Sequence, residues 1–290
     1  MIYTHSGMFH ADDALAVAIV QMCVPLHENE IVRVRELPET FGKNDIAVDI
    51  GGVYDPDRKI FDHHFAGGSN DGCAAVGKIW KYVNFPDELK DRVYLTLIGS
   101  IDRADIGVAD WIPVKDDWRH LSASALISSM NPPSGSTYER VMDCFMHAVE
   151  CMRCALVGAV EQAKTWLKME EVVKTSEIIG SKILVLTTGG PWQEHIFNQN
   201  KKNILYVIYP SERGGFCLQC VPDVLGGFGM RKSLPEDWWG LKKSEFIVVL
   251  PPRRGGWTDT PSLFAHPGGF IAGSETLEEA KELALLAVNA

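Results

Sequence analysis

The sequence lacks an excess of positive charge. Its 290 residues include 28 Lys and Arg against 38 Asp and Glu, which gives a formal net charge of -10. A protein that coats duplex nucleic acid usually presents a basic face, and this composition gives no sign of one. An acidic chain can still act on phosphate groups where bound metal ions supply positive charge locally.

Long apolar runs and targeting signals are also missing. No run of about 18 uncharged apolar residues is present, so we expect no membrane span and no membrane partner. The chain passes from Met1 directly into a strand-like Ile2-Tyr3-Thr4, without the basic and apolar regions of a secretory signal. We therefore expect a cytoplasmic protein, with an organelle or the nucleus as alternatives in a eukaryote.

Cysteine is scarce, and its seven copies do not predict a metal or redox site. Cys151 and Cys154 form one CxxC pair in a helical stretch. Cys217 and Cys220 form another in a strand-like stretch, where residues three apart face opposite sides of a sheet. Reduced, mostly buried thiols are the favoured interpretation.

The chain contains two regions of different character, which together predict an α/β protein. Strand-like and helical runs alternate up to about residue 105. Residues 138–173 then read as helix, longer than a usual globular helix, and predict either two helices or one connector. Beyond Gly180 the pattern is a smaller α+β region, with a last helix capped by Ser274. Its strand candidates are residues 183–186, 204–209, 216–221 and 246–250. The predicted domains are 1–135 with a mainly parallel sheet, a helical connector 136–175, and 176–290.

Histidine and aspartate gather in four stretches at predicted strand or helix ends: residues 4–13, 48–52, 61–64 and 101–105. Ligands of open α/β sheets bind beyond the carboxyl ends of the strands, so we expect these stretches to meet. Imidazole and carboxylate together suit Mn²⁺, Mg²⁺, Fe²⁺ or Zn²⁺. The candidate ligands are His5, His10, Asp12, Asp49, His63 and Asp102, with Asp13, Asp62, His64 and Asp105 in reserve.

The number of candidate ligands favours two metal ions. A lone zinc needs about four ligands, whereas here there are six, and we assign Asp49 as the carboxylate between two ions. Two ions about 3.5–4 Å apart can lower the pKa of a bridging water and neutralise a phosphoryl oxygen. The sequence therefore predicts hydrolysis of a phosphoester or phosphoanhydride. Asp12 and Asp13 could instead only start a helix, but coincidence does not explain all four stretches.

Asp62-His63-His64 resembles the signature motif of the DHH phosphoesterase superfamily. More closely, the whole chain resembles the melanocyte-proliferating-gene-1 exonuclease family. The stretches that carry this second resemblance are residues 4–13, 48–56, 62–64, 101–105, 190–195, 219–222, 234–238, 240–241 and 266–273. One departure is His10, which stands where superfamily members often have an aspartate.

The resemblance implies a two-domain DHH-like fold and a 3′–5′ exonuclease that acts chiefly on RNA. It implies that the same six side chains bind two divalent ions, with Mn²⁺ expected and Mg²⁺ as the alternative. It also implies that Asp62 and His64 support the ligands or face a phosphate, and so act with Asp49 in catalysis.

The second half offers candidate substrate-binding residues. His266, Gly268 and Gly269 resemble the Gly-rich, His-containing substrate motif of the superfamily, and such a loop lets backbone N–H groups approach a phosphate. A tight turn between strands is the alternative. Arg231-Lys232 and Arg253-Arg254 could clamp a phosphate tail, or could be solvated surface pairs. Four tryptophans could stack on bases: Trp192, Trp238, Trp239 and Trp257. We expect most of them to be buried instead.

The sequence thus predicts a metal-dependent phosphodiesterase that removes nucleotides from the 3′ end of RNA or short oligonucleotides. One alternative is a hydrolase of pyrophosphate or a nucleotide, which would need a narrow basic cleft. The other is a metal-bound protein that binds without catalysis. A homodimer is compatible with the sequence.

Overall fold

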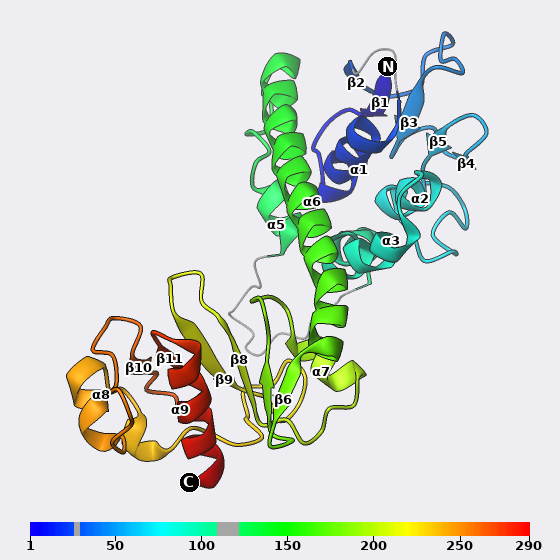
Figure 1. Ribbon diagram of the computed structural model, residues 1–290. Coiled ribbons are helices and arrows are strands. Elements are labelled where there is room, and N and C mark those ends of the chain that lie inside the picture. The colour runs from blue at the N-terminus through cyan, green and yellow to red at the C-terminus, as the bar shows by residue number, and fades with distance from the viewer. Residues whose placement is uncertain (26–29, 109–121) are drawn as a thin grey trace. The chain divides into compact units, whose positions relative to one another are not determined.

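The computed structural model describes residues 1–25, 30–108 and 122–290 (Figure 1). They form two compact units, Met1–Ala163 and Lys164–Ala290, and the boundary between the units falls inside helix α6 (Tyr138–Thr175). The stretch predicted as two helices or one connector is therefore a single continuous helix. Within the described ranges, no helix combines the length and the apolar character needed to cross a bilayer.

The sheet of the first unit is mainly parallel, which confirms the predicted α/β architecture. Its strands lie in the order β2-β1-β3-β5-β4, and only β4 runs antiparallel to its neighbour. The chain passes from β1 to β2 on one side and to β3 on the other, so the strand order switches direction between β1 and β3. Ligand sites of such sheets lie at this switch point. The strands are β1 (Ile2–His5), β2 (Ile31–Val34), β3 (Ile46–Val48), β4 (Tyr54–Asp55) and β5 (Ile60–Phe61).

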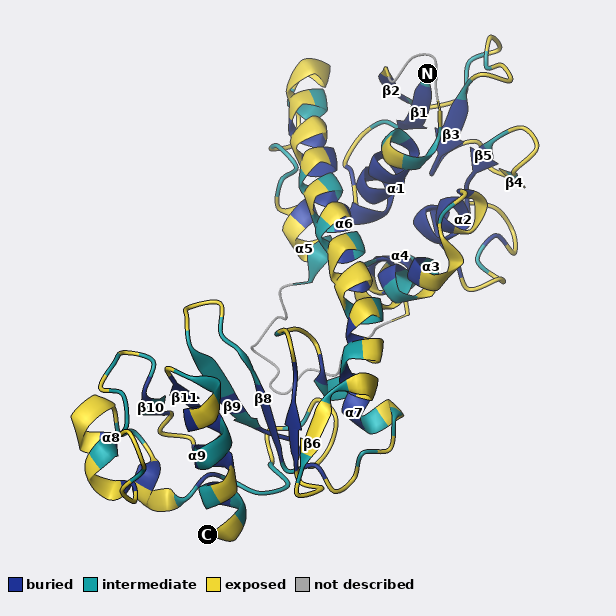
Figure 2. Ribbon diagram, viewed as in Figure 1, coloured by how far each residue is buried: buried dark blue, intermediate teal, exposed yellow. Residues whose placement is uncertain are grey.

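Helix α1 (Ala11–Cys23) follows β1 and is buried from Ala11 to Val20, as its nearly continuous apolar sequence predicts (Figure 2). It packs against α2, α4 and α5. The sequence pattern predicts that Asp102 and Asp105 follow a helix, and this prediction was wrong: both lie within α4. The other helical elements of this unit are α2 (Ala75–Tyr82), α3 (Asp87–Val93), the π-helical turn η1 (Tyr94–Ile98), α4 (Gly99–Asp105) and α5 (Ala123–Ser128).

The second unit is built on a mixed sheet with the strand order β10-β11-β9-β8-β7-β6. Only β7 and β8 pair in parallel among its neighbouring strands. The strands are β6 (Glu177–Ile179), β7 (Ile183–Val185), β8 (Tyr206–Pro210), β9 (Phe216–Cys220), β10 (Phe264–Ala265) and β11 (Ile271–Ser274). The helical elements are α7 (Gln193–Asn198), the 3-10 turn η2 (Glu236–Trp238), α8 (Lys243–Val249) and α9 (Leu277–Asn289).

A hydrophobic core lies on each face of this second sheet. Because successive strand residues point to opposite sides, neighbouring residues of one strand belong to different cores. Ile183 and Tyr206 belong to a core that includes residues of α8 and α9. Leu184 and Val207 belong to another core, which includes residues from the end of α6 and from α7. The α+β character predicted for this half is confirmed.

Two local predictions in the second unit were wrong. Residues 246–250 form most of α8 and its end, not a strand. Phe246 and Leu250, four residues apart, are buried on one helical face, whereas Val248 between them is 82% exposed. The last helix is capped by Thr276 and not by Ser274, which ends β11. Thr276 accepts a hydrogen bond from the Glu279 N–H, and the Glu279 carboxylate accepts from the Thr276 N–H, which makes a capping box.

Candidate metal centre

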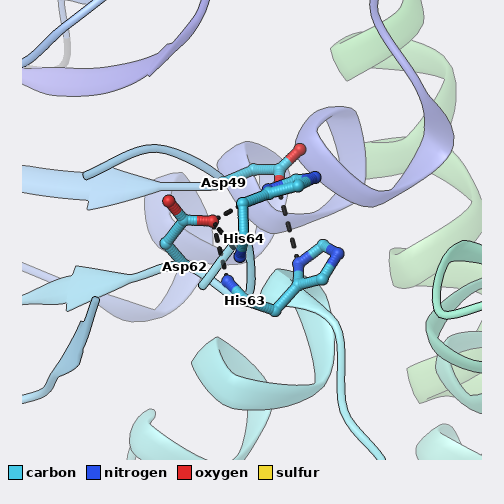
Figure 3. A group of neighbouring side chains, drawn as sticks. All are labelled: Asp49, Asp62, His63 and His64. Atoms are coloured by element: carbon cyan, nitrogen blue, oxygen red, sulfur yellow. Dashed lines mark hydrogen bonds and ion pairs between the residues drawn. The ribbon is translucent and has the colours of Figure 1, made fainter. Parts of the chain in front are cut away.

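The predicted histidines and aspartates of the first unit meet at the carboxyl-terminal edge of its sheet. His5 ends β1, Asp49 follows β3 directly, and Asp62 and His63 follow β5 directly. Figure 3 shows Asp49 and His63 facing each other from the ends of neighbouring strands. His10 and Asp12 lie at the start of α1, and Asp105 ends α4.

The ligand atoms fall into three groups, in each of which all atoms lie within 4.8 Å of one another. The groups are His5, His10 and Asp49; Asp12, His63 and Asp105; and Asp49, Asp62, His63 and His64. Each could hold a metal ion. Asp49 belongs to two of the groups and contacts His63, which belongs to the remaining one: its Oδ2 lies 3.4 Å from His5 Nε2, and its Oδ1 lies 3.5 Å from His63 Nδ1. Its two oxygens thus face different histidines.

The centre gathers buried polar atoms that have no hydrogen-bond partner among the described residues. They are Asp12 Oδ2, both Asp49 carboxylate oxygens, His5 Nε2 and His63 Nδ1, together with Asp13 Oδ2. Buried polar atoms are normally hydrogen-bonded, so such a concentration requires a reason. The donor set, imidazole nitrogen with carboxylate oxygen, fits a divalent cation. The side chains present therefore fit the metal ions that the sequence predicts.

The pKa values of these groups indicate the same need for positive charge. Burial raises the pKa of Asp12 well above its ordinary value, and the charges of Asp49 and Asp105 raise it further. Burial alone would also raise the pKa of Asp49, but His5 and His64 lower it. Burial alone would lower the pKa of His5, yet Asp13 and Asp49 raise it to about 10. In the chain by itself, imidazoles thus supply the charge that a cation would otherwise bring.

Asp49 also has an unusual backbone. Its φ of 57° lies in the left-handed region, which non-glycine residues rarely adopt and which is common at functional sites. The Asp49 N–H donates to the Phe61 carbonyl at 2.9 Å, so the end of β3 stays tied to β5 in this conformation. The backbone thus holds the central carboxylate at the edge of the sheet.

Asp102 lies beside the centre, and its carboxylate accepts hydrogen bonds from the start of α2. Its buried carboxylate accepts hydrogen bonds from the N–H groups of Ala74 and Gly77, at 2.8 and 3.1 Å, and from the Tyr94 hydroxyl, at 2.7 Å. A Cβ on Gly77 would overlap this carboxylate, which explains the glycine. Asp105, a reserve candidate in the sequence, belongs instead to the group with Asp12 and His63, and its Oδ2 lies 3.2 Å from His63 Nε2.

Asp62 and His64 form the outer part of the centre. Asp62 accepts hydrogen bonds from the N–H groups of Gly52, His63 and His64, so it fixes the loop that carries both histidines. His64 Nδ1 lies 2.9 Å from Asp62 Oδ1, and 61% of the His64 side chain is exposed. The Asp49 carboxylate, whose Oδ1 lies 3.2 Å from His64 Nδ1, raises the pKa of His64 to about 9.

Asp13 and Arg33 form a buried pair beside His5 that the sequence did not predict. Asp13 accepts from the His10 and Ala14 N–H groups, and its Oδ2 lies 3.2 Å from His5 Nε2. Arg33 on β2 lies 3.8 Å from the same oxygen, and it donates to the Gly7 carbonyl at 3.0 Å. No sequence signal pointed to the role of Arg33. The alternation of valine and arginine in residues 32–35 predicts that both arginines face solvent, whereas Arg33 is buried.

Asn131 holds the loop between His5 and His10. Its side-chain oxygen accepts from the Phe9 N–H at 2.9 Å, and its amide group donates to the Phe9 carbonyl at 2.8 Å. No sequence signal could have linked two residues that are 122 positions apart.

Most basic candidates of the second unit are engaged within the chain. Arg231 donates to the carbonyls of Lys201 and Ile204, and Lys232 donates to that of Val288. Arg253 forms ion pairs with Glu282, at 2.6 Å, and with Glu279, at 3.5 Å. Arg254 is exposed.

The glycine motif forms a tight turn between β10 and β11. The N–H groups of Gly268 and Gly269 donate to Nδ1 and to the carbonyl of His266, at 3.0 and 2.9 Å. Gly269 has a φ of 64°, and a Cβ there would overlap Trp239, so the turn itself explains this glycine. Trp192 and Trp238 are buried, whereas Trp239 is exposed and Trp257 is partly exposed, so the expectation that most of these tryptophans are buried holds for two of the four. The cysteines of both CxxC pairs are free thiols.

Comparison with known proteins gives a consistent result over nearly the whole length. The family model named for MYG1 exonuclease, described as an uncharacterised protein family (UPF0160), matches residues 1–288. The MYG1 exonuclease of Bos taurus is 28% identical, with 98% of this chain and 83% of the relative covered. The MYG1 exonuclease of Homo sapiens is 27% identical, covering 98% and 84%. A MYG1 protein of Schizosaccharomyces pombe is 29% identical, covering 99% and 97%. No solved structure matches.

Proposed function

The chain belongs to the MYG1 exonuclease family (UPF0160), and on this premise we propose that it is a divalent-metal-dependent phosphodiesterase that removes nucleotides from the 3′ end of RNA or short oligonucleotides. The observation that carries the proposal is the set of buried oxygen and nitrogen atoms around Asp49 that lack a hydrogen-bond partner among the described residues. The position of Asp62-His63-His64 at the end of β5 supports placement in the DHH phosphoesterase superfamily.

Two groups of side chains would hold the cations. His5 and His10 form one, Asp12, His63 and Asp105 form the other, and Asp49 faces both. Asp105 thereby takes the place that the sequence gave to Asp102. When bound, a pair of divalent cations supplies Lewis-acid chemistry, since it polarises a phosphoryl oxygen and lowers the pKa of water. Mn²⁺ is the expected ion and Mg²⁺ the alternative.

The protein's own contribution is orientation. His5 Nδ1 lies 3.1 Å from the Ser6 carbonyl, a contact that leaves Nε2 facing the carboxylates. Asp13, which itself contacts Arg33, helps to fix this ring. Asp62 holds the exposed His64 at the rim of the centre, where its imidazole N–H can donate to a phosphate oxygen or to a leaving group.

The second unit would bind the substrate chain. Because Arg231, Lys232 and Arg253 are engaged within the chain, Arg254 and His266, both exposed, are the better phosphate contacts. We retain the proposed division into a catalytic domain (1–135), a connector (136–175) and a substrate-binding domain (176–290).

The test is hydrolysis of a 5′-labelled short RNA by metal-stripped protein, with Mn²⁺ or Mg²⁺ added back. The wild type should give a ladder that shortens from the 3′ end, and Asp49→Asn should not. Asp57→Asn, an exposed carboxylate in the turn between β4 and β5, is the matched control and should retain activity.

Other outcomes separate the alternatives. Cleavage of pyrophosphate or nucleotides alone would favour a small-phosphate hydrolase. Bound metal without turnover of RNA, DNA, dinucleotides or pyrophosphate would favour a binding protein.

A further inference from the structure

The second unit contains a cavity of about 570 Å³ at the start of α7, beside β8 and β9. Its volume lies in the range of small-molecule sites. Two stretches that carry the family resemblance, residues 190–195 and 219–222, border it and have no role in the metal centre. The described residues that line it are Gly190, Pro191, Trp192, Gln193, Glu194, Tyr209, Gln219, Leu225 and Gly226.

The lining does not suit a phosphate. None of the described lining residues is basic, and the one charged group is the carboxylate of Glu194. The remaining groups are aromatic rings, an aliphatic side chain and the amides of Gln193 and Gln219. Amides both donate and accept, and carboxylates accept from N–H groups. This combination suits a flat, uncharged heterocycle whose edge carries N–H donors and carbonyl or ring-nitrogen acceptors.

The polar groups of the cavity are held in place by neighbours. The Tyr209 hydroxyl donates to Gln219 Oε1 at 2.7 Å, which orients the amide and leaves its nitrogen as the donor. The Trp166 indole donates to Glu194 Oε2 at 3.0 Å, and the His195 ring packs at a tilt against the Trp166 ring, with centroids 4.6 Å apart. Groups positioned in this way lose little conformational freedom when a ligand binds.

One wall of the cavity belongs to an exposed apolar loop. Leu225 and Gly226 line the cavity, and the neighbouring Val224 and Phe228 are 59% and 102% exposed. A fully exposed phenylalanine offers a ring face on which a base can stack. Adjacent exposed apolar side chains commonly mark a contact surface.

We propose that this cavity binds a nucleobase of single-stranded RNA. Gln219 and Glu194 contact the edge of the base, and the loop with Leu225 and Phe228 covers its face. The inference rests on the proposed function, since the base is the part of the substrate that a metal centre does not contact. Because Glu194 accepts hydrogen bonds, bases with an exocyclic amino group should bind better than uracil.

The experiment measures binding of guanosine and uridine to the full, metal-stripped chain by isothermal titration calorimetry. Nucleosides carry no phosphate, so the metal centre does not contribute. Guanosine should bind more tightly than uridine. Gln219→Leu should weaken guanosine binding about tenfold, because a ligand polar group loses its partner. Phe228→Ser should weaken the binding of both nucleosides, whereas Val248→Ser, at another highly exposed apolar site on α8, should not.

The inference is overturned if nucleosides do not bind saturably, or if Gln219→Leu and Phe228→Ser bind them as the wild type does. Phe228 makes no buried contact, so its variant stays informative if Gln219→Leu fails to fold. Two measurements separate this inference from the proposed function: nucleoside binding and RNA cleavage. Asp49→Asn should bind nucleosides as the wild type does. If Asp49→Asn binds nucleosides while the wild type cleaves no RNA, the result supports the cavity and rejects the exonuclease. Cleavage by a wild type that binds no nucleoside would do the reverse.

Discussion

Asp102 and Asp105 lie three residues apart in α4, and we predict that their asparagine variants fail in opposite ways. The buried Asp102 carboxylate accepts hydrogen bonds from the Ala74 and Gly77 N–H groups and from the Tyr94 hydroxyl. Asp102→Asn removes the charge and one acceptor oxygen of this group. Hydrogen bonds to a charged group contribute about 1.5–3 kcal/mol each. The free energy of unfolding of the metal-free protein should fall by about 2–3 kcal/mol.

Asp105→Asn should leave the metal-free protein as stable as the wild type, or slightly more stable. Its side chain is 18% exposed, and removing its charge relieves the repulsion that raises the pKa of Asp12. Metal binding should suffer instead, because a ligand is lost. A cation present at 100 times its dissociation constant stabilises the folded state by about 2.7 kcal/mol. A hundredfold loss of affinity would reduce this stabilisation to about 0.4 kcal/mol.

The assay is thermal unfolding of metal-stripped wild type and both variants, with and without Mn²⁺, beside metal content by mass spectrometry. For a unit of this size, Asp102→Asn should lower Tm by about 5–10 °C and still respond to Mn²⁺. Asp105→Asn should keep its Tm and respond weakly. The reasoning is refuted if Asp102→Asn unfolds like the wild type but binds no metal, or if Asp105→Asn binds metal normally.

Three further variants test separate parts of the fold. Asp49→Asn and Asp49→Val both remove the carboxylate that pairs with His5 and His64, so their difference reports on the backbone: Asp49→Val should be about 1–3 kcal/mol less stable than Asp49→Asn in urea unfolding, because asparagine tolerates the left-handed backbone; equal stability of the two variants would contradict this. Arg33→Leu should cost about 3–5 kcal/mol, because it removes one of the ion-pair partners of the buried Asp13 carboxylate, and the exposed Arg35→Leu is the control that should unfold normally. Thr276→Ala should destabilise the second unit by about 1 kcal/mol and leave Mn²⁺ uptake unchanged; reduced uptake would argue against separate units.

The place where the candidate ligands meet could be predicted because it follows from strand ends. His5, Asp49 and His63 each stand at or just after an apolar run, and parallel strands bring such positions to one edge of a sheet. The choice between Asp102 and Asp105 could not be predicted. Three residues turn a helix by about 300°, so both point to similar sides, and only the packing of α4 against α2 separates them.

The spacing of apolar residues explains why the helix α1 was predicted correctly and why residues 246–250 were not. The long apolar stretch of α1 reads as a buried helix at any rotation, whereas residues 246–250 fit both a strand and a helix. Only the exposure of Val248 distinguishes the two. Asn131 could not be found at all, because its role depends on a contact with the distant Phe9.

The parallel register of the first sheet bears on how this site can change during evolution. Tyr3 pairs with Ala47, and Ala47 with Ile60; continued by two residues, this register aligns His5, Asp49 and Asp62. Adjacent strands lie about 4.8 Å apart, so backbone hydrogen bonds set the spacing of the residues that bear the ligands. Insertions in the connections at the opposite edge should therefore be tolerated across a lineage. A one-residue slip of β3 would turn Asp49 to the other face of the sheet, and selection should preserve the length of that strand.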